Sequence, residues 1–116
     1  MDDKEHAQAT LAMLYSQARA QFGRAVKSYW FCDGDACPGC LRAVDTLRYK
    51  GQDTLSLNAF MHRPRGVLIG YLLCSRCARR ILRAAHSHTK EKTPLHEVIE
   101  QRLVQGYEQY LRSLDA

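Results

Sequence analysis

The sequence has no uninterrupted apolar run of about 18 residues, the length that a membrane-spanning helix requires. Residues 2–5 are all charged, and no apolar segment typical of a secretory signal peptide follows them. We therefore expect no membrane contact and no export. The expected location is the cytoplasm, including the nucleoid, where cysteines more often bind metals or do redox work than form structural disulfides.

The chain also lacks the short motifs of common enzyme classes. It has no glycine-rich phosphate loop, no serine or cysteine nucleophile motif, no internal repeat and no low-complexity tract. His62, His86 and His88 lie near a predicted hairpin and past the helix that follows it. No acidic ligand accompanies them, so they do not form the metal-binding set that a ββα nuclease needs. We therefore predict binding and no catalysis.

Length and composition indicate one soluble globular domain, covering residues 1–116. Of the 116 residues, 46% are hydrophobic and 25% are charged, which is ordinary for such a domain. A chain of this size buries only a modest core, so a structural metal would add useful stability.

Four of the five cysteines form two Cys-x-x-Cys pairs, Cys37/Cys40 and Cys74/Cys77. Each pair can place two thiolates on one side of a tight turn, and four thiolates complete a tetrahedral zinc shell. Because this shell is closed, we predict one structural Zn²⁺ per chain. Cys32 is left outside, although it could replace Cys37 or serve as a buried apolar residue. The alternative chemistry for the pairs is a redox dithiol or an iron–sulfur centre.

Long amphipathic helices are predicted on both sides of the cysteine pairs, over residues 4–29 and 94–114. Both segments carry apolar side chains at three- and four-residue steps, and Thr93-Pro94 is a helix start signal. The first helix is longer than a small zinc module would cover. Its apolar stripe should therefore pack on the C-terminal helix, or on a second copy of the chain in a homodimer. The aromatic side chains of residues 29–31, Tyr-Trp-Phe, should pack in the core between the helix and the metal module, with stacking on nucleic-acid bases as the alternative.

Between the cysteine pairs the pattern predicts a β-hairpin. Residues 54–62 alternate apolar and polar side chains, whereas residues 67–73 are almost continuously apolar and so should be covered on both faces. Residues 63–66, Arg-Pro-Arg-Gly, form the turn. Residues 42–50 are ambiguous between a short strand and a loop. A helix should follow Cys74, with Cys77 in its first turn, and a polar linker should cover residues 86–92.

The predicted order is a cysteine knuckle, a β-hairpin and a helix whose first turn carries the second cysteine pair. This order resembles the treble-clef group of zinc fingers over residues 32–88. The resemblance implies zinc-ligand roles for Cys37, Cys40, Cys74 and Cys77, and an α+β fold with the zinc module between terminal helices. The chain departs from the group at Leu41, where glycine is common, and in the 33 residues between the pairs. A zinc ribbon is the alternative, but the helical pattern after Cys77 argues against it.

Positive charge is concentrated in one part of the chain. Residues 62–92 hold eight Lys and Arg residues against one acidic residue, whereas the whole chain has a net charge of +5. Such asymmetry favours a polyanionic or acidic partner. The candidate binding residues are those of the hairpin tip and the following helix: Arg63, Arg65, Arg76, Arg79, Arg80 and Arg83.

If these arginines form one surface, they would contact phosphates of nucleic acid, DNA or RNA, with little base reading. The alternative is a protein–protein interaction module, such as an accessory, adaptor or inhibitory subunit, whose basic face docks on an acidic protein. A solvated basic surface without a partner is the third interpretation.

Overall fold

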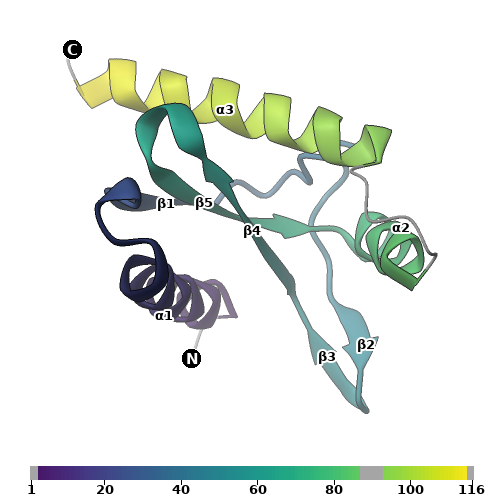
Figure 1. Ribbon diagram of the computed structural model, residues 1–116. Helices are drawn as coiled ribbons and strands as arrows, with labels where there is room; N and C mark the ends of the chain where they lie inside the picture. Colours follow the sequence, from purple (N-terminus) through teal and green to yellow (C-terminus); the bar gives the residue numbers. More distant parts are fainter. Residues whose placement is uncertain (1–2, 87–92, 115–116) are drawn as a thin grey trace.

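The computed structural model describes residues 3–86 and 93–114 (Figure 1). Within these residues the fold is mixed α+β, with three α-helices and two small sheets. The elements in chain order are α1 (Asp3–Phe22), a 3₁₀ turn η1 (Gly23–Ala25), β1 (Ser28–Cys32), β2 (Leu47–Tyr49), β3 (Gln52–Thr54), β4 (Ser56–His62), a second 3₁₀ turn η2 (Arg63–Arg65), β5 (Val67–Leu73), α2 (Ser75–His86) and α3 (Pro94–Leu114). No helix in these ranges has the length and apolarity to cross a membrane.

The larger sheet has the strand order β1-β5-β4. Strand β4 pairs antiparallel with β5 and forms the predicted hairpin, with His62 opposite Val67. Strand β1 pairs parallel with β5, with Ser28 opposite Val67. Strands β2 and β3 form a separate antiparallel ribbon, which projects from the body beside α2 (Figure 1). The ambiguous stretch 42–50 therefore contains a loop followed by a short strand.

The predicted end of the N-terminal helix is wrong, because α1 ends at Phe22 and residues 28–32 form β1. Gly23 has a φ of +63°, a left-handed conformation that commonly ends a helix and that glycine adopts without strain. The following Ser-Tyr-Trp-Phe-Cys segment is rich in aromatic side chains, which favour strands. Pairing with β5 then outweighs the apolar pattern that had extended the helix to residue 29.

Helix α3 covers one face of the sheet and α1 covers the other (Figure 1). All seven residues of β5 are buried, which confirms the prediction that this strand is covered on both faces. On the α3 side, alternate β5 residues pack with Ile99, Leu103 and Tyr107 in one core. Trp30 joins this core, with ring centroids 5.4 Å from Tyr107 and 5.7 Å from Tyr110, so core packing of this aromatic is confirmed.

Helix α1 packs on the sheet through Leu11, which is fully buried. A Cβ at Gly70 of β5 would lie 2.5 Å from Leu11 Cδ2, so only glycine permits this close approach. The expected packing of the N-terminal helix on the C-terminal helix is therefore wrong, since the sheet separates them. Helix α3 has the predicted bounds, and Thr93 Oγ1 accepts the His96 N–H at 3.3 Å as its N-cap. The predicted linker lies largely outside the described residues.

Candidate metal centre

The first cysteine pair lies in a tight turn closed by backbone hydrogen bonds. Cys37 N–H donates to the Arg42 carbonyl and Leu41 N–H donates to the Cys37 carbonyl, both at 2.7 Å. Leu41 has a φ of +67°, the left-handed region that favours glycine. The departure from the treble-clef pattern at this residue therefore has a structural cost, because the turn needs this backbone conformation whichever side chain is present.

The second cysteine pair lies at the start of α2, with Cys74 directly before the helix and Cys77 in its first turn, and a carboxylate from another segment caps this helix start. Asp45 accepts the Ser75 N–H at 2.7 Å and the Ser75 hydroxyl at 2.9 Å. These bonds, the backbone one first, hold the pKa of Asp45 below its usual value. Sequence reasoning missed Asp45, because the capping residue usually precedes its helix directly, whereas this one lies in the loop before β2.

The four predicted ligands come together. The sulfur atoms of Cys37, Cys40, Cys74 and Cys77 all lie within 4.8 Å of one another, and Cys40 Sγ is 3.5 Å from Cys74 Sγ. Sulfurs in a tetrahedral shell with bonds of about 2.3 Å lie about 3.8 Å apart, so this cluster has the size of a metal shell. Cys40 is exposed and the other three are buried. Cys32 is not in the cluster and lies half-buried against the core.

Backbone donors and close packing support this cysteine cluster. Gly39 N–H points at Cys37 Sγ at 3.4 Å, and Cys77 N–H points at Cys74 Sγ at 3.5 Å. Such donors stabilise negative charge on sulfur. A Cβ at Gly39 would lie 2.9 Å from Cys77 Sγ and 3.2 Å from Leu95 Cδ1 of α3, so this position requires glycine.

Helix α3 also holds the first turn directly. Arg102 Nη1 donates to the Pro38 carbonyl at 2.9 Å. The cluster is therefore held by three segments: the first cysteine turn, the start of α2 and α3.

The chemistry of the donor set fits a thiophilic metal ion. Burial, followed by hydrogen bonding from the other three thiols, raises the pKa of Cys77, so the protonated form is favoured when only protein surrounds it. A bound cation reverses this balance and releases protons. Four sulfurs without an oxygen ligand suit Zn²⁺ and disfavour Mg²⁺ and Ca²⁺. The cluster can therefore hold one metal ion.

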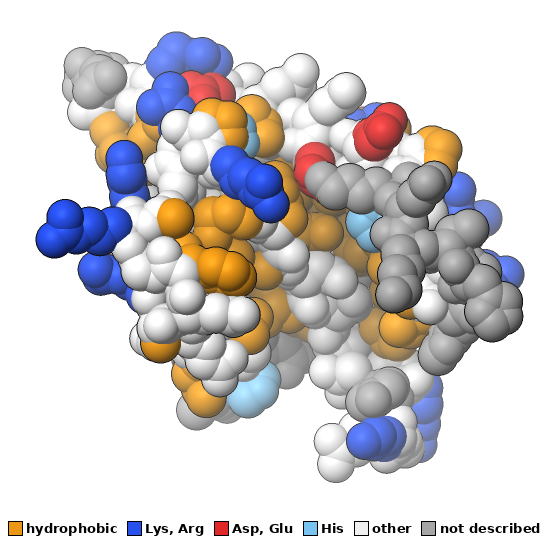
Figure 2. Space-filling model, in the orientation of Figure 1, with side chains coloured by type: hydrophobic (Ala, Val, Ile, Leu, Met, Phe, Trp, Pro, Cys, Tyr) orange, Lys and Arg blue, Asp and Glu red, His pale blue; other side chains and the backbone are white. Residues whose placement is uncertain are grey.

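Four of the predicted arginines form a single surface on α2, which we call the arginine face: Arg76, Arg79, Arg80 and Arg83. Their spacing of three, four and seven residues places them on one side of the helix, and all four are exposed. In the described part of the chain none of them forms an ion pair. Figure 2 shows blue side chains along the edge of the molecule where α2 lies in Figure 1.

The two hairpin arginines do not join this face. They lie at the opposite end of β5 from α2 (Figure 1), and seven strand residues span about 23 Å. Arg65 forms a two-pronged ion pair with Glu108 of α3, at 2.7 Å from Nε and 2.9 Å from Nη2. The expectation of one basic surface that includes Arg63 and Arg65 is therefore wrong, because folding separates the two groups and Glu108 neutralises Arg65.

Comparison of the chain with protein families, with curated proteins and with solved structures finds no match in any of the three.

Proposed function

We propose that the chain is a small, non-enzymatic zinc protein that binds the phosphate groups of nucleic acid through the arginine face. The observation that carries this proposal is the position of four guanidinium groups, none with an ion pair in the described part of the chain, on a helix whose first turn belongs to the cysteine cluster. A metal ion there would fix the direction in which the arginine face points.

Zinc is the ion that the donor set favours, and its role would be structural. Four cysteines occupy all positions of a tetrahedral shell, so none is left for a substrate or an activated water. The order of first cysteine turn, β-strands and helix supports the treble-clef resemblance. Bound zinc would link the first cysteine turn to α2, and the arginine face would bind the phosphate groups.

Like charge on the arginine face favours a polyanionic ligand. Residues 76 to 83 span about 10 Å of helix, and four positive charges within that length repel one another. Duplex nucleic acid carries one phosphate charge per about 1.7 Å of its axis, so several phosphates lie within reach of this face. Guanidinium groups bind phosphate oxygens in a two-pronged geometry, which suits arginine better than lysine.

A salt titration of binding to random-sequence duplex and single-stranded DNA and RNA tests this proposal. If all four arginines contact phosphates, log K should fall with log[salt] at a slope of about −3 to −4. Between 50 and 200 mM salt the affinity should then fall roughly a hundredfold. Failure to bind any of these nucleic acids at low salt would rule the proposal out.

A matched pair of variants separates the arginine face from net charge. Arg76→Gln/Arg80→Gln removes two charges from the face, and Arg24→Gln/Arg63→Gln removes two exposed charges elsewhere. The first variant should make the slope of log K against log[salt] shallower by about 2, and the second should leave this slope nearly unchanged. Equal effects of the two variants would contradict a specific role for the arginine face.

A further inference from the structure

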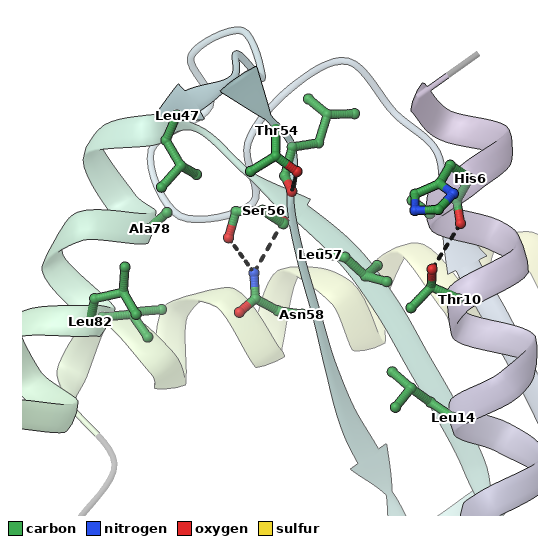
Figure 3. A pocket seen from close by; sticks show the side chains of 13 residues that line it. His6, Thr10, Leu14, Leu47, Thr54, Ser56, Leu57, Asn58, Ala78 and Leu82 are labelled. Atoms are coloured by element: carbon green, nitrogen blue, oxygen red, sulfur yellow. Dashed lines mark hydrogen bonds between the residues drawn. The ribbon is translucent and has the colours of Figure 1, made fainter. Parts of the chain in front are cut away.

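Phosphate binding leaves a groove between α1 and α2 without a role, and this groove has a volume of about 520 Å³ (Figure 3). Its apolar walls include Leu14 on α1, Leu57 on β4 and Leu82 on α2. No Lys, Arg, Asp or Glu lines it. Leu14 and Leu82 face this space from opposite walls, and 38% and 46% of their surfaces are exposed.

The groove exists because the helical layer on this face of the sheet is incomplete. Leu57 lies opposite Leu72 of β5, so both side chains point to the same face of the sheet. Leu72 is only 2% exposed, whereas every residue of β4 is half-buried. Helix α1 covers β5 through Leu11 and Gly70 but leaves this end of β4 open. One more helix between α1 and α2 would complete the layer.

We propose that this groove binds an amphipathic helix of a partner protein, with acidic side chains on the flank that faces α2. Two helices stand on either side of β4 (Figure 3), which is the geometry of helix-in-groove recognition. An added strand fits less well, because Asn58 Nδ2 already donates to the Ser56 carbonyl of β4 at 3.2 Å.

The charges at the rim select an acidic partner. On α2, Arg79 and Arg83 lie about 60° and 100° around the helix axis from Leu82, whereas Arg76 and Arg80 lie about 120° and 160° away. Carboxylates of a helix resting on Leu82 would therefore meet Arg79 and Arg83. A second copy of this chain is a poor occupant, because each copy carries a net charge of +5.

Two synthetic helical peptides provide the probes. Both carry leucines at positions i, i+3, i+4 and i+7, and they differ only in having Glu or Lys on the remaining positions. Binding to the zinc-loaded protein is followed by fluorescence anisotropy at low salt. The Glu peptide should bind at least about tenfold more tightly than the Lys peptide. Equal binding, or no binding of the Glu peptide at millimolar concentration, would overturn the proposal.

Variants of the groove walls test the site itself. Leu14→Gln/Leu82→Gln should weaken binding of the Glu peptide roughly tenfold or more, because two apolar contacts are lost. Met13→Gln/Phe22→Gln is the matched control, since these side chains are 65% and 60% exposed and lie outside the lining. Its effect should stay below about twofold. Equal losses would place the peptide elsewhere and overturn the proposal.

Two arginine pairs separate this site from phosphate binding. Arg79→Gln/Arg83→Gln should weaken the Glu peptide about fivefold, and Arg76→Gln/Arg80→Gln should change it little. Nucleic acid, in contrast, should lose affinity to a similar extent with either pair. If both arginine variants lost affinity for the Glu peptide to the same extent, the proposal would be overturned. Sedimentation that shows a dimer disrupted by Leu14→Gln/Leu82→Gln would also overturn it, because the groove would then hold a second copy.

Discussion

The two ends of β5 differ in how completely the chain satisfies its own charges. At the hairpin end, Glu108 neutralises Arg65, and Gly66 adopts a left-handed conformation in which its carbonyl accepts the Lys27 N–H at 2.8 Å. At the cysteine end, four sulfurs lie together and four arginines have no ion pair in the described chain. The hairpin end thus pairs one of its two arginines within the chain, whereas the arginines at the cysteine end have no such partner among the described residues. Ligands are therefore expected at the cysteine end.

The largest expected effect comes from removing a sulfur at the cysteine end. Cys37→Ser and Cys74→Ser should each abolish stoichiometric zinc, because a shell with three sulfurs no longer closes. Elemental analysis of gently purified protein measures this. Cys32→Ser is the control, since Cys32 lies outside the cluster. One zinc per chain in both ligand variants would refute the assignment.

A smaller effect is expected from crowding the same centre. Gly39→Ala places a methyl group against Cys77 Sγ and Leu95, so zinc affinity should fall about tenfold to a hundredfold. Competition with a chromogenic chelator measures the affinity. Gly34→Ala is the matched control, because nothing lies within 4 Å of its Cβ position. If the two variants bind zinc equally well, the close packing around Cys77 does not control the site.

Relieving the strain at Leu41 should stabilise the cysteine end slightly. Leu41 is 62% exposed, so Leu41→Gly loses little burial and removes a left-handed backbone penalty. The net gain should be about 0.5–1 kcal/mol once the greater freedom of glycine in the unfolded chain is counted. Denaturant unfolding of the zinc-loaded proteins measures it. Leu41→Ala keeps the penalty and should show no gain.

The smallest effect belongs to the hairpin end and depends on pH. The Arg65 ion pair holds the pKa of Glu108 below its usual value, so this pair stabilises the fold above the unfolded-state pKa, and the stabilisation is lost as the pH falls. Glu108→Gln should therefore be slightly less stable than the natural protein at pH 7, and the two should converge below about pH 4. Thermal unfolding across this range measures the difference. A gap that persists in acid would mean that packing, and not charge, holds Glu108.

Local patterns predicted much of this molecule. The two cysteine pairs, the bounds of α3 and the buried strand β5 all follow from spacing or periodicity within a short stretch. The glycine expected in place of Leu41 also proved informative, because the backbone there has the conformation that glycine prefers. Each of these features is decided by neighbours in sequence.

Features decided by distant contacts were missed or wrong. Residues 28–32 continue the apolar pattern of α1, and only the parallel pairing with β5 makes them a strand. The Asp45 cap joins two segments separated by 30 positions. The separation of Arg65 from the arginine face follows from the direction of β5, which no count of charges can reveal.

The parallel pairing of β1 has a consequence for biosynthesis. The ribosome releases residues 28–32 well before the strand that begins at Val67, so the first strand of the sheet has to wait for its neighbour. The antiparallel hairpin of β4 and β5 needs only one short turn and can form as soon as it emerges. The N-terminal segment can dock only after this hairpin has emerged, so α1 and β1 are the part of the nascent chain that is exposed longest to chaperones and proteases.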